Sequence, residues 1–168
     1  MAEPRHRYLV ALGSNMRVPG VGGPAQVLRA AIGRLAGPQC KIAAVSGIIA
    51  SRPIGPSIRR FANAAAVIET ELPPPALLEV LQEVEREFGR RRRGGRWRAR
   101  PLDLDIVLWS GGVWASADLT IPHPLFRERD FVIGPAAEIA PHWRDPVTAL
   151  TLRQLAARIR KPRPAPRA

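Results

Sequence analysis

One run near the middle of the chain decides the fold: Leu102-Asp103-Leu104-Asp105-Ile106-Val107-Leu108-Trp109. It is dense in β-forming residues and is followed by Gly111-Gly112, as is typical of a strand that ends in a turn. Successive side chains of a strand point to opposite faces, so Asp103 and Asp105 share one face while leucine and isoleucine occupy the other. The run therefore predicts a strand with one face in the core and two carboxylates on the opposite face.

Apolar periodicity and proline or glycine boundaries predict the elements upstream of this strand. In chain order they are a strand over residues 8–12, a helix over residues 24–35, strands over residues 41–50 and 61–71, and a helix that follows Pro73-Pro74-Pro75 and ends before Gly89. The resulting β-α-β-β-α-β order predicts an α+β, ferredoxin-like fold, in which helices cover one face of an antiparallel sheet.

The remaining sequence predicts a short C-terminal extension. Residues 113–160 carry short elements and one helical stretch at residues 150–159, and we assign residues 1–160 to a single domain. Residues 161–168 are rich in arginine and proline, and they predict a disordered basic tail.

Composition narrows the classes of function. Apolar residues make up 46% of the chain, which is enough for a core, and no apolar run reaches the roughly 18 residues of a membrane span. The N-terminus lacks the pattern of a secretory signal and Cys40 is the single cysteine, so we expect a cytoplasmic protein that does not bind membranes. The net charge of +12 comes almost wholly from arginine, and arginine favours phosphate as a partner.

The paired carboxylates suit a hard cation. Mg²⁺ takes one or two protein carboxylates and completes its octahedron with water and substrate phosphate oxygens. Alone, Asp103 and Asp105 are equally well explained as two surface acids on an edge strand.

An arginine-rich segment precedes the carboxylates, and by itself it would be a solvated loop. It comprises Arg90-Arg91-Arg92-Arg93, Arg96, Arg98 and Arg100, with Gly89, Gly94 and Gly95 interspersed. Beside a carboxylate pair, guanidinium groups can hold triphosphate oxygens, and the glycines would let the segment close over a bound substrate.

Several motifs, in order along the chain, together resemble one family. They are Ala11-Leu12-Gly13-Ser14-Asn15, Phe61-Ala62-Asn63-Ala64, Gly89-Arg90, Arg96-Trp97-Arg98-Ala99-Arg100-Pro101-Leu102-Asp103-Leu104-Asp105-Ile106, Leu119-Thr120-Ile121-Pro122-His123-Pro124, Arg129-Asp130-Phe131-Val132 and Glu138-Ile139-Ala140-Pro141. On these motifs the chain resembles the 6-hydroxymethyl-7,8-dihydropterin pyrophosphokinases of folate biosynthesis, from Tyr8 to about Leu155. The resemblance implies the ferredoxin-like fold, ATP as co-substrate and two Mg²⁺ ions.

The resemblance also implies a role for each matching residue. Asp103 and Asp105 would hold the metal ions and, with Arg90 and Arg100, form the catalytic set. ATP would contact Gln82, Glu85, Arg90, Arg92, Arg100, Ile106, Thr120, His123 and Arg129. The pterin would contact Ser51, Pro53, Ile54, Phe61, Asn63, Trp97 and Phe131, with Trp97 either capping the closed site or pinning the loop.

Taken singly, several of these residues have simpler explanations. Phe61 and Phe131 would more often be core residues, and Glu85 would be an exposed helical glutamate. His123 would be structural or idle. Asn63, inside an apolar strand, needs a hydrogen-bond partner in any case.

The resemblance implies transfer of a diphosphate from ATP to the pterin alcohol, with AMP as the other product. We expect a monomer that binds small molecules and no nucleic acid. An RNA-binding module is the main rival, because ferredoxin-like sheets can bind RNA, but residues 61–67 lack the aromatic spacing of that motif. A nucleotidyltransferase is the second rival, and it would release pyrophosphate instead of AMP.

Overall fold

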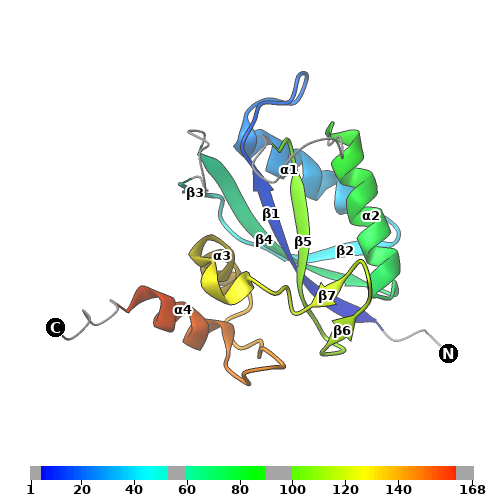
Figure 1. Ribbon diagram of the computed structural model, residues 1–168. Helices are drawn as coiled ribbons and strands as arrows, with labels where there is room; N and C mark the ends of the chain where they lie inside the picture. Colours follow the sequence, from blue (N-terminus) through cyan, green and yellow to red (C-terminus); the bar gives the residue numbers. More distant parts are fainter. Residues whose placement is uncertain (1–4, 53–59, 90–99, 162–168) are drawn as a thin grey trace.

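The structure confirms the predicted β-α-β-β-α-β order of elements along the chain, with one strand divided in two. The computed structural model describes residues 5–52, 60–89 and 100–161. The five-stranded sheet contains β1 (His6–Ser14), β2 (Cys40–Val45), β3 (Ile49–Ser51), β4 (Phe61–Thr70) and β5 (Asp103–Trp109). Its strands run antiparallel in the order β2-β4-β1-β5, and β3 pairs with β4 as well (Figure 1).

The predicted strand over residues 41–50 is broken into two. β2 and β3 pair with the same neighbour, from Cys40 opposite Thr70 to Ser51 opposite Phe61. At the break, the Oγ atom of Ser46 accepts a hydrogen bond from the N–H of Ala65 at 2.8 Å. The side chain thus replaces a main-chain partner where the two strands separate.

Two amphipathic helices, α1 (Pro24–Leu35) and α2 (Pro74–Glu87), cover one face of the sheet. Both have proline in the first turn, where the missing N–H has no intrahelical partner to lose. Their buried residues, such as Leu28 and Leu81, pack against Val10, Leu12 and the even-numbered residues of β4. Leu102, Leu104 and Ile106 join this core, as the alternation in β5 predicts.

The opposite face is partly covered as well, which differs from the single helical face that we expected. η1 (Phe126–Glu128), α3 (Asp130–Ile139) and α4 (Leu152–Arg160) follow β6 (Trp114–Ala115) and β7 (Thr120–Ile121). Ile133 and Leu155 pack with Leu9, Val67 and Val107 of the sheet in a second apolar core. Figure 1 shows α3 lying beside β4. No helix in the described ranges has the length and apolar character needed to cross a bilayer.

Candidate active site

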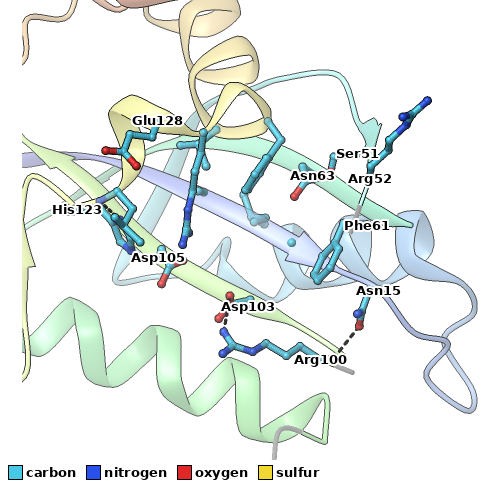
Figure 2. A pocket seen from close by; sticks show the side chains of 17 residues that line it. Asn15, Ser51, Arg52, Phe61, Asn63, Arg100, Asp103, Asp105, His123 and Glu128 are labelled. Atoms are coloured by element: carbon cyan, nitrogen blue, oxygen red, sulfur yellow. Dashed lines mark hydrogen bonds and ion pairs between the residues drawn. The ribbon is translucent and has the colours of Figure 1, made fainter. Parts of the chain in front are cut away.

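A hollow of about 720 Å³ lies on the second face of the sheet, where strand side chains stay uncovered beside α3 (Figure 2). Its floor comes from odd-numbered residues of three strands: Ala11 and Gly13 of β1, Phe61 and Asn63 of β4, and Asp103 and Asp105 of β5. Its wall comes from the segment between His123 and Val132. The face that α1 and α2 leave open therefore carries the polar residues of the strands.

The carboxylates lie on one side of β5, as predicted. Gly13 pairs with Asp103 on one side and with Asn63 on the other, so the three residues form a row across the sheet. Asp105 is paired with Ala11 in the next row. Because glycine has no side chain, the row leaves open space between the carboxylate and the amide.

Glu85 supports the strand between the two carboxylates. It is 4% exposed, and its Oε1 atom accepts the N–H of Leu104 at 2.8 Å. The interpretation of Glu85 as an exposed helical residue is therefore wrong. Because β5 is an edge strand, the N–H of Leu104 has no strand partner on that side, and a carboxylate from α2 satisfies it.

Among the described residues, Arg100 forms an ion pair with the first carboxylate. Its Nη1 atom lies 2.9 Å from Oδ2 of Asp103. The main chain of Arg100 is fixed by Asn15, whose Oδ1 atom accepts the Arg100 N–H at 2.7 Å. Asn15 lines the hollow and was given no role from the sequence. Its signal was a polar residue directly after a buried strand, which required a partner.

His123 lies at the end of the hollow near Asp105. Its main-chain N–H donates to the carbonyl oxygen of Val107 at 3.0 Å, and its Nδ1 atom accepts the N–H of Leu125 at 3.2 Å. The neutral ring therefore carries its proton on Nε2. Burial lowers the pKa of His123, the charge of Arg129 lowers it further, and Asp103 opposes both.

Aromatic and amide groups gather at the other end of the hollow (Figure 2). Nδ2 of Asn63 donates to Oγ of Ser51 at 2.5 Å, which confirms that the buried amide is partnered. A Cβ placed on Gly13 would lie 3.5 Å from Oδ1 of Asn63 and 3.9 Å from Cδ1 of Phe61, so both groups border the open glycine. Phe131 lines the wall, and its ring centroid lies 5.8 Å from the guanidinium carbon of Arg129.

A second hollow of about 210 Å³ lies between α2, the β6–β7 turn and β5. Gln82, Glu85, Asp105 and Asp118 line it, so Asp105 borders both hollows.

The remaining predicted residues lie elsewhere. The Ile106 side chain is 3% exposed in the core between the sheet and the helices, so only its main chain can contact a ligand. Thr120 is an exposed residue of β7 that lines neither hollow. Pro53, Ile54, Arg90, Arg92 and Trp97 lie outside the described residues.

Three more residues that line the large hollow could not be identified from the sequence. Arg52 and Glu128 are exposed polar residues, and Leu125 is an exposed apolar one. Their neighbours His123 and Arg129 stood in recognisable motifs, whereas the positions of these three residues depend on the path of the loops.

Known structures agree with the fold. The chain is similar to the crystal structure of wild-type HPPK-DHPS of Plasmodium falciparum with pteroate, at a TM-score of 0.71 and 13% identity. The match covers 94% of this chain and 45% of the other, so the chain spans less than half of that longer protein. At this identity the likeness shows the fold alone.

Curated relatives are closer in sequence. The chain is 36% identical over 158 residues to the 2-amino-4-hydroxy-6-hydroxymethyldihydropteridine pyrophosphokinase of Synechocystis, which covers 89% of this chain and 74% of the relative. It is 40% identical to the enzyme of that name from Pseudomonas aeruginosa (83% and 84%) and 36% identical to the one from Bacillus subtilis (90% and 89%).

The family comparison agrees with these relatives. The model of the family 7,8-dihydro-6-hydroxymethylpterin-pyrophosphokinase matches residues 9–141, which include most of the sheet, the carboxylate pair and the wall of the hollow. The chain therefore belongs to the 7,8-dihydro-6-hydroxymethylpterin-pyrophosphokinase family.

Proposed function

We propose that this chain uses Mg²⁺ and ATP to transfer a diphosphate to the hydroxymethyl group of 6-hydroxymethyl-7,8-dihydropterin, in folate biosynthesis. The activity follows from the family, and the assignment of residues rests on the geometry. One observation carries it: a carboxylate pair, several cationic side chains and two aromatic rings all line one hollow.

The ring would lie at the end formed by Phe61, Asn63 and Phe131. Aromatic faces hold a flat fused heterocycle by stacking, and an amide offers both a donor and an acceptor to its edge. Because Nδ2 of Asn63 donates to Ser51, its Oδ1 atom would accept a ring N–H. The ring substituent would then extend through the open space above Gly13 toward Asp103.

The phosphates would lie at the other end. Arg100, His123 and Arg129 line the hollow, and guanidinium groups bind phosphate oxygens in bidentate fashion. The Nε2–H of His123 would donate to a phosphate oxygen, since its Nδ1 atom is already an acceptor. Gln82 and the second hollow beside Asp105 would receive the nucleoside.

The donor set fits Mg²⁺ held in part by its substrate. Asp103 and Asp105 provide hard oxygen atoms on one face, and the described residues contain no cluster of three or more metal-binding side chains. Such a pair leaves coordination positions for water and phosphate oxygens. When bound, the metal would neutralise phosphate charge and polarise the substrate hydroxyl.

The reaction needs no covalent intermediate on the protein. The hydroxymethyl oxygen forms a bond to the β-phosphorus, the bond from that phosphorus to the α–β bridging oxygen breaks, and AMP leaves with the bridging oxygen. The hydroxyl proton is released. The described residues would contribute by aligning the two substrates and by balancing the developing charge.

Product analysis tests the proposal. The chain, ATP, Mg²⁺ and the hydroxymethyl dihydropterin should yield AMP and the pterin diphosphate in equal amounts. Release of pyrophosphate would identify a nucleotidyltransferase and reject the proposal. An RNA-binding module would bind single-stranded RNA and form neither product; β1 and β4 argue against it, because Ala11, Gly13 and Asn63 accompany Phe61 on the open face.

A further inference from the structure

Phe126 and Arg127 anchor the wall of the large hollow on the side that faces away from the hollow. Glu128 and Arg129 line the hollow. Phe126 instead is 1% exposed in the second core, and Arg127 lies with its guanidinium carbon 4.7 Å from the Phe126 ring centroid. The segment therefore presents one side to the hollow and anchors the other in the C-terminal part of the chain.

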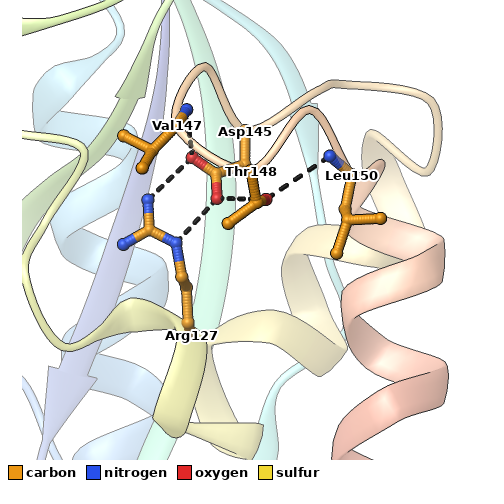
Figure 3. Close-up of polar contacts among 5 residues, drawn as sticks. All are labelled: Arg127, Asp145, Val147, Thr148 and Leu150. Atoms are coloured by element: carbon orange, nitrogen blue, oxygen red, sulfur yellow. Dashed lines mark hydrogen bonds and ion pairs between the residues drawn. The ribbon is translucent and has the colours of Figure 1, made fainter.

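The ionic anchor is Asp145, which is fully buried. Its Oδ2 atom lies 2.6 Å from Nε of Arg127, and its Oδ1 atom lies 2.7 Å from Nη2, a bidentate pair (Figure 3). The same carboxylate accepts the hydroxyl of Thr148 at 2.6 Å and the N–H of Val147 at 3.0 Å. Four donors thus fix the position of the carboxylate.

The loop that carries Asp145 is itself anchored. The N–H of Asp145 donates to the carbonyl oxygen of Leu150 at 2.9 Å. The carbonyl oxygen of Asp145 accepts the N–H of Ala149 at 2.8 Å. Leu152 of α4, which follows at once, is fully buried in the second core. Asp145 is therefore held in a fixed position, and its ion pair with Arg127 attaches η1 to this loop.

We propose that Arg127 and Asp145 act as a positioning pair, which holds η1 so that Arg129 faces the phosphate end of the hollow. Arg129 follows Arg127 by two residues and begins α3 as its N-cap. Neither member of the pair lines the hollow. The inference rests on the proposed function, because it assigns the pair's effect to binding of ATP.

The chain contains a matched pair for comparison. Arg34 of α1 and Glu87 of α2 form the same bidentate contact, with both nitrogen–oxygen distances at 2.7 Å. Their side chains are 57% and 36% exposed, and neither helix contributes to the large hollow. A general effect of losing an arginine–carboxylate pair would appear in both places, whereas a positioning effect would appear at Asp145 alone.

The test compares Asp145→Asn with Glu87→Gln at a temperature where both variants are folded. Asp145→Asn should raise the KM for ATP about tenfold, since small displacements of positioned groups are costly, while kcat and the KM for the pterin change less than about twofold. Arg127→Lys keeps the charge but loses the fork, so it should give a smaller increase. Glu87→Gln should match the unaltered chain.

Hydrogen exchange provides a readout that needs no turnover. The N–H groups of Glu128 and Arg129 donate within the wall, to Leu125 at 3.2 Å and to Phe126 at 3.3 Å. In Asp145→Asn these two should exchange faster, while amides of β1 and β4 stay protected.

The two readouts separate the possible failures. A lower melting temperature with an unchanged KM for ATP and unchanged exchange at Glu128 and Arg129 would overturn the positioning role. If Asp145→Asn does not fold, Arg127→Lys decides by the same criteria. If the unaltered chain forms no AMP, the proposed function fails, and the exchange measurement still decides whether the pair holds the wall.

Discussion

Asn15 holds the main chain of Arg100 from 85 positions away in the sequence. Its Oδ1 atom accepts the Arg100 N–H at 2.7 Å, and its own N–H donates to the Arg100 carbonyl oxygen at 3.2 Å. The end of β1 and the residue that leads into β5 are thereby joined on the hollow's floor. The cation beside Asp103 is consequently placed by a neutral amide.

Asn15→Ala should lower turnover while the chain stays folded. The Arg100 N–H would lose its acceptor, which should lower the free energy of unfolding by about 1–3 kcal/mol. The main chain of Arg100 would then no longer be held in place. We expect kcat/KM for ATP to fall about tenfold and the melting temperature to drop. Asn15→Asp retains the acceptor oxygen and should keep the main-chain contact. Equal kcat/KM for Asn15→Ala and the unaltered chain would show that Arg100 needs no such support.

Asp103→Ala should abolish turnover while the fold persists, because the carboxylate is on the open face of an edge strand. In the proposed metal site, Asp103 supplies one of two carboxylates, and its removal should lower kcat by about 100-fold or more. AMP formation and far-UV circular dichroism measure the two effects. Glu79→Gln, an exposed carboxylate on α2, is the control for lost charge and should leave turnover intact. Undiminished turnover in Asp103→Ala would remove this carboxylate from the site.

The parts of the site that depend on local alternation could be predicted from sequence. The two-residue period of β5 placed Asp103 and Asp105 together because strand geometry fixes that relationship within a few residues. The same local rule put Leu104 and Ile106 in the core, where the structure has them.

Features that depend on distant partners could not be predicted. α3 contains Gly134 and Pro135, which disfavour a helix locally, and burial of Ile133 and Ala136 against the sheet overrides that preference. Glu85 lay at the margin of its helical stripe, and its burial depends on an unpaired N–H on an edge strand 19 residues away. In each case the deciding contact forms only when the chain has folded.

Gly13→Ala should weaken pterin binding selectively. The new Cβ would lie 3.5 Å from the nearest atom, an ordinary contact, so the strand should fold without strain. The methyl group would nevertheless occupy the floor between Asn63 and Phe61. A single extra carbon in a binding site changes affinity by about tenfold or more. We therefore expect the KM for the pterin to rise about tenfold, with the KM for ATP unchanged.

A second glycine provides the control for Gly13→Ala. Gly33 lies in α1 with open space around it, so Gly33→Ala should leave both KM values unchanged and stabilise the helix. Equal pterin KM values for the two variants would place the ring away from Gly13.

Protonation of Asp145 should account for a distinct part of the stability that the chain loses in acid. Burial by itself would raise the pKa of this carboxyl, but hydrogen bonds from Arg127, Thr148 and Val147 more than offset it and lower the pKa from 3.8 to about 2. The folded state therefore binds the proton less readily than the unfolded state does. Its stabilising contribution is present above pH 3.8 and is lost as the pH falls toward 2.

The difference between the two pKa values corresponds to about 2 kcal/mol. Urea unfolding at pH 5, 4, 3 and 2 should show the unaltered chain losing that much more stability than Asp145→Asn over this interval, because the asparagine has no proton to bind. Other carboxyl groups titrate in both proteins, so the difference between their curves isolates this one. Parallel curves would mean that the carboxyl titrates alike in the folded and unfolded chain, and that the contacts with Arg127 and Thr148 do not favour its charged form.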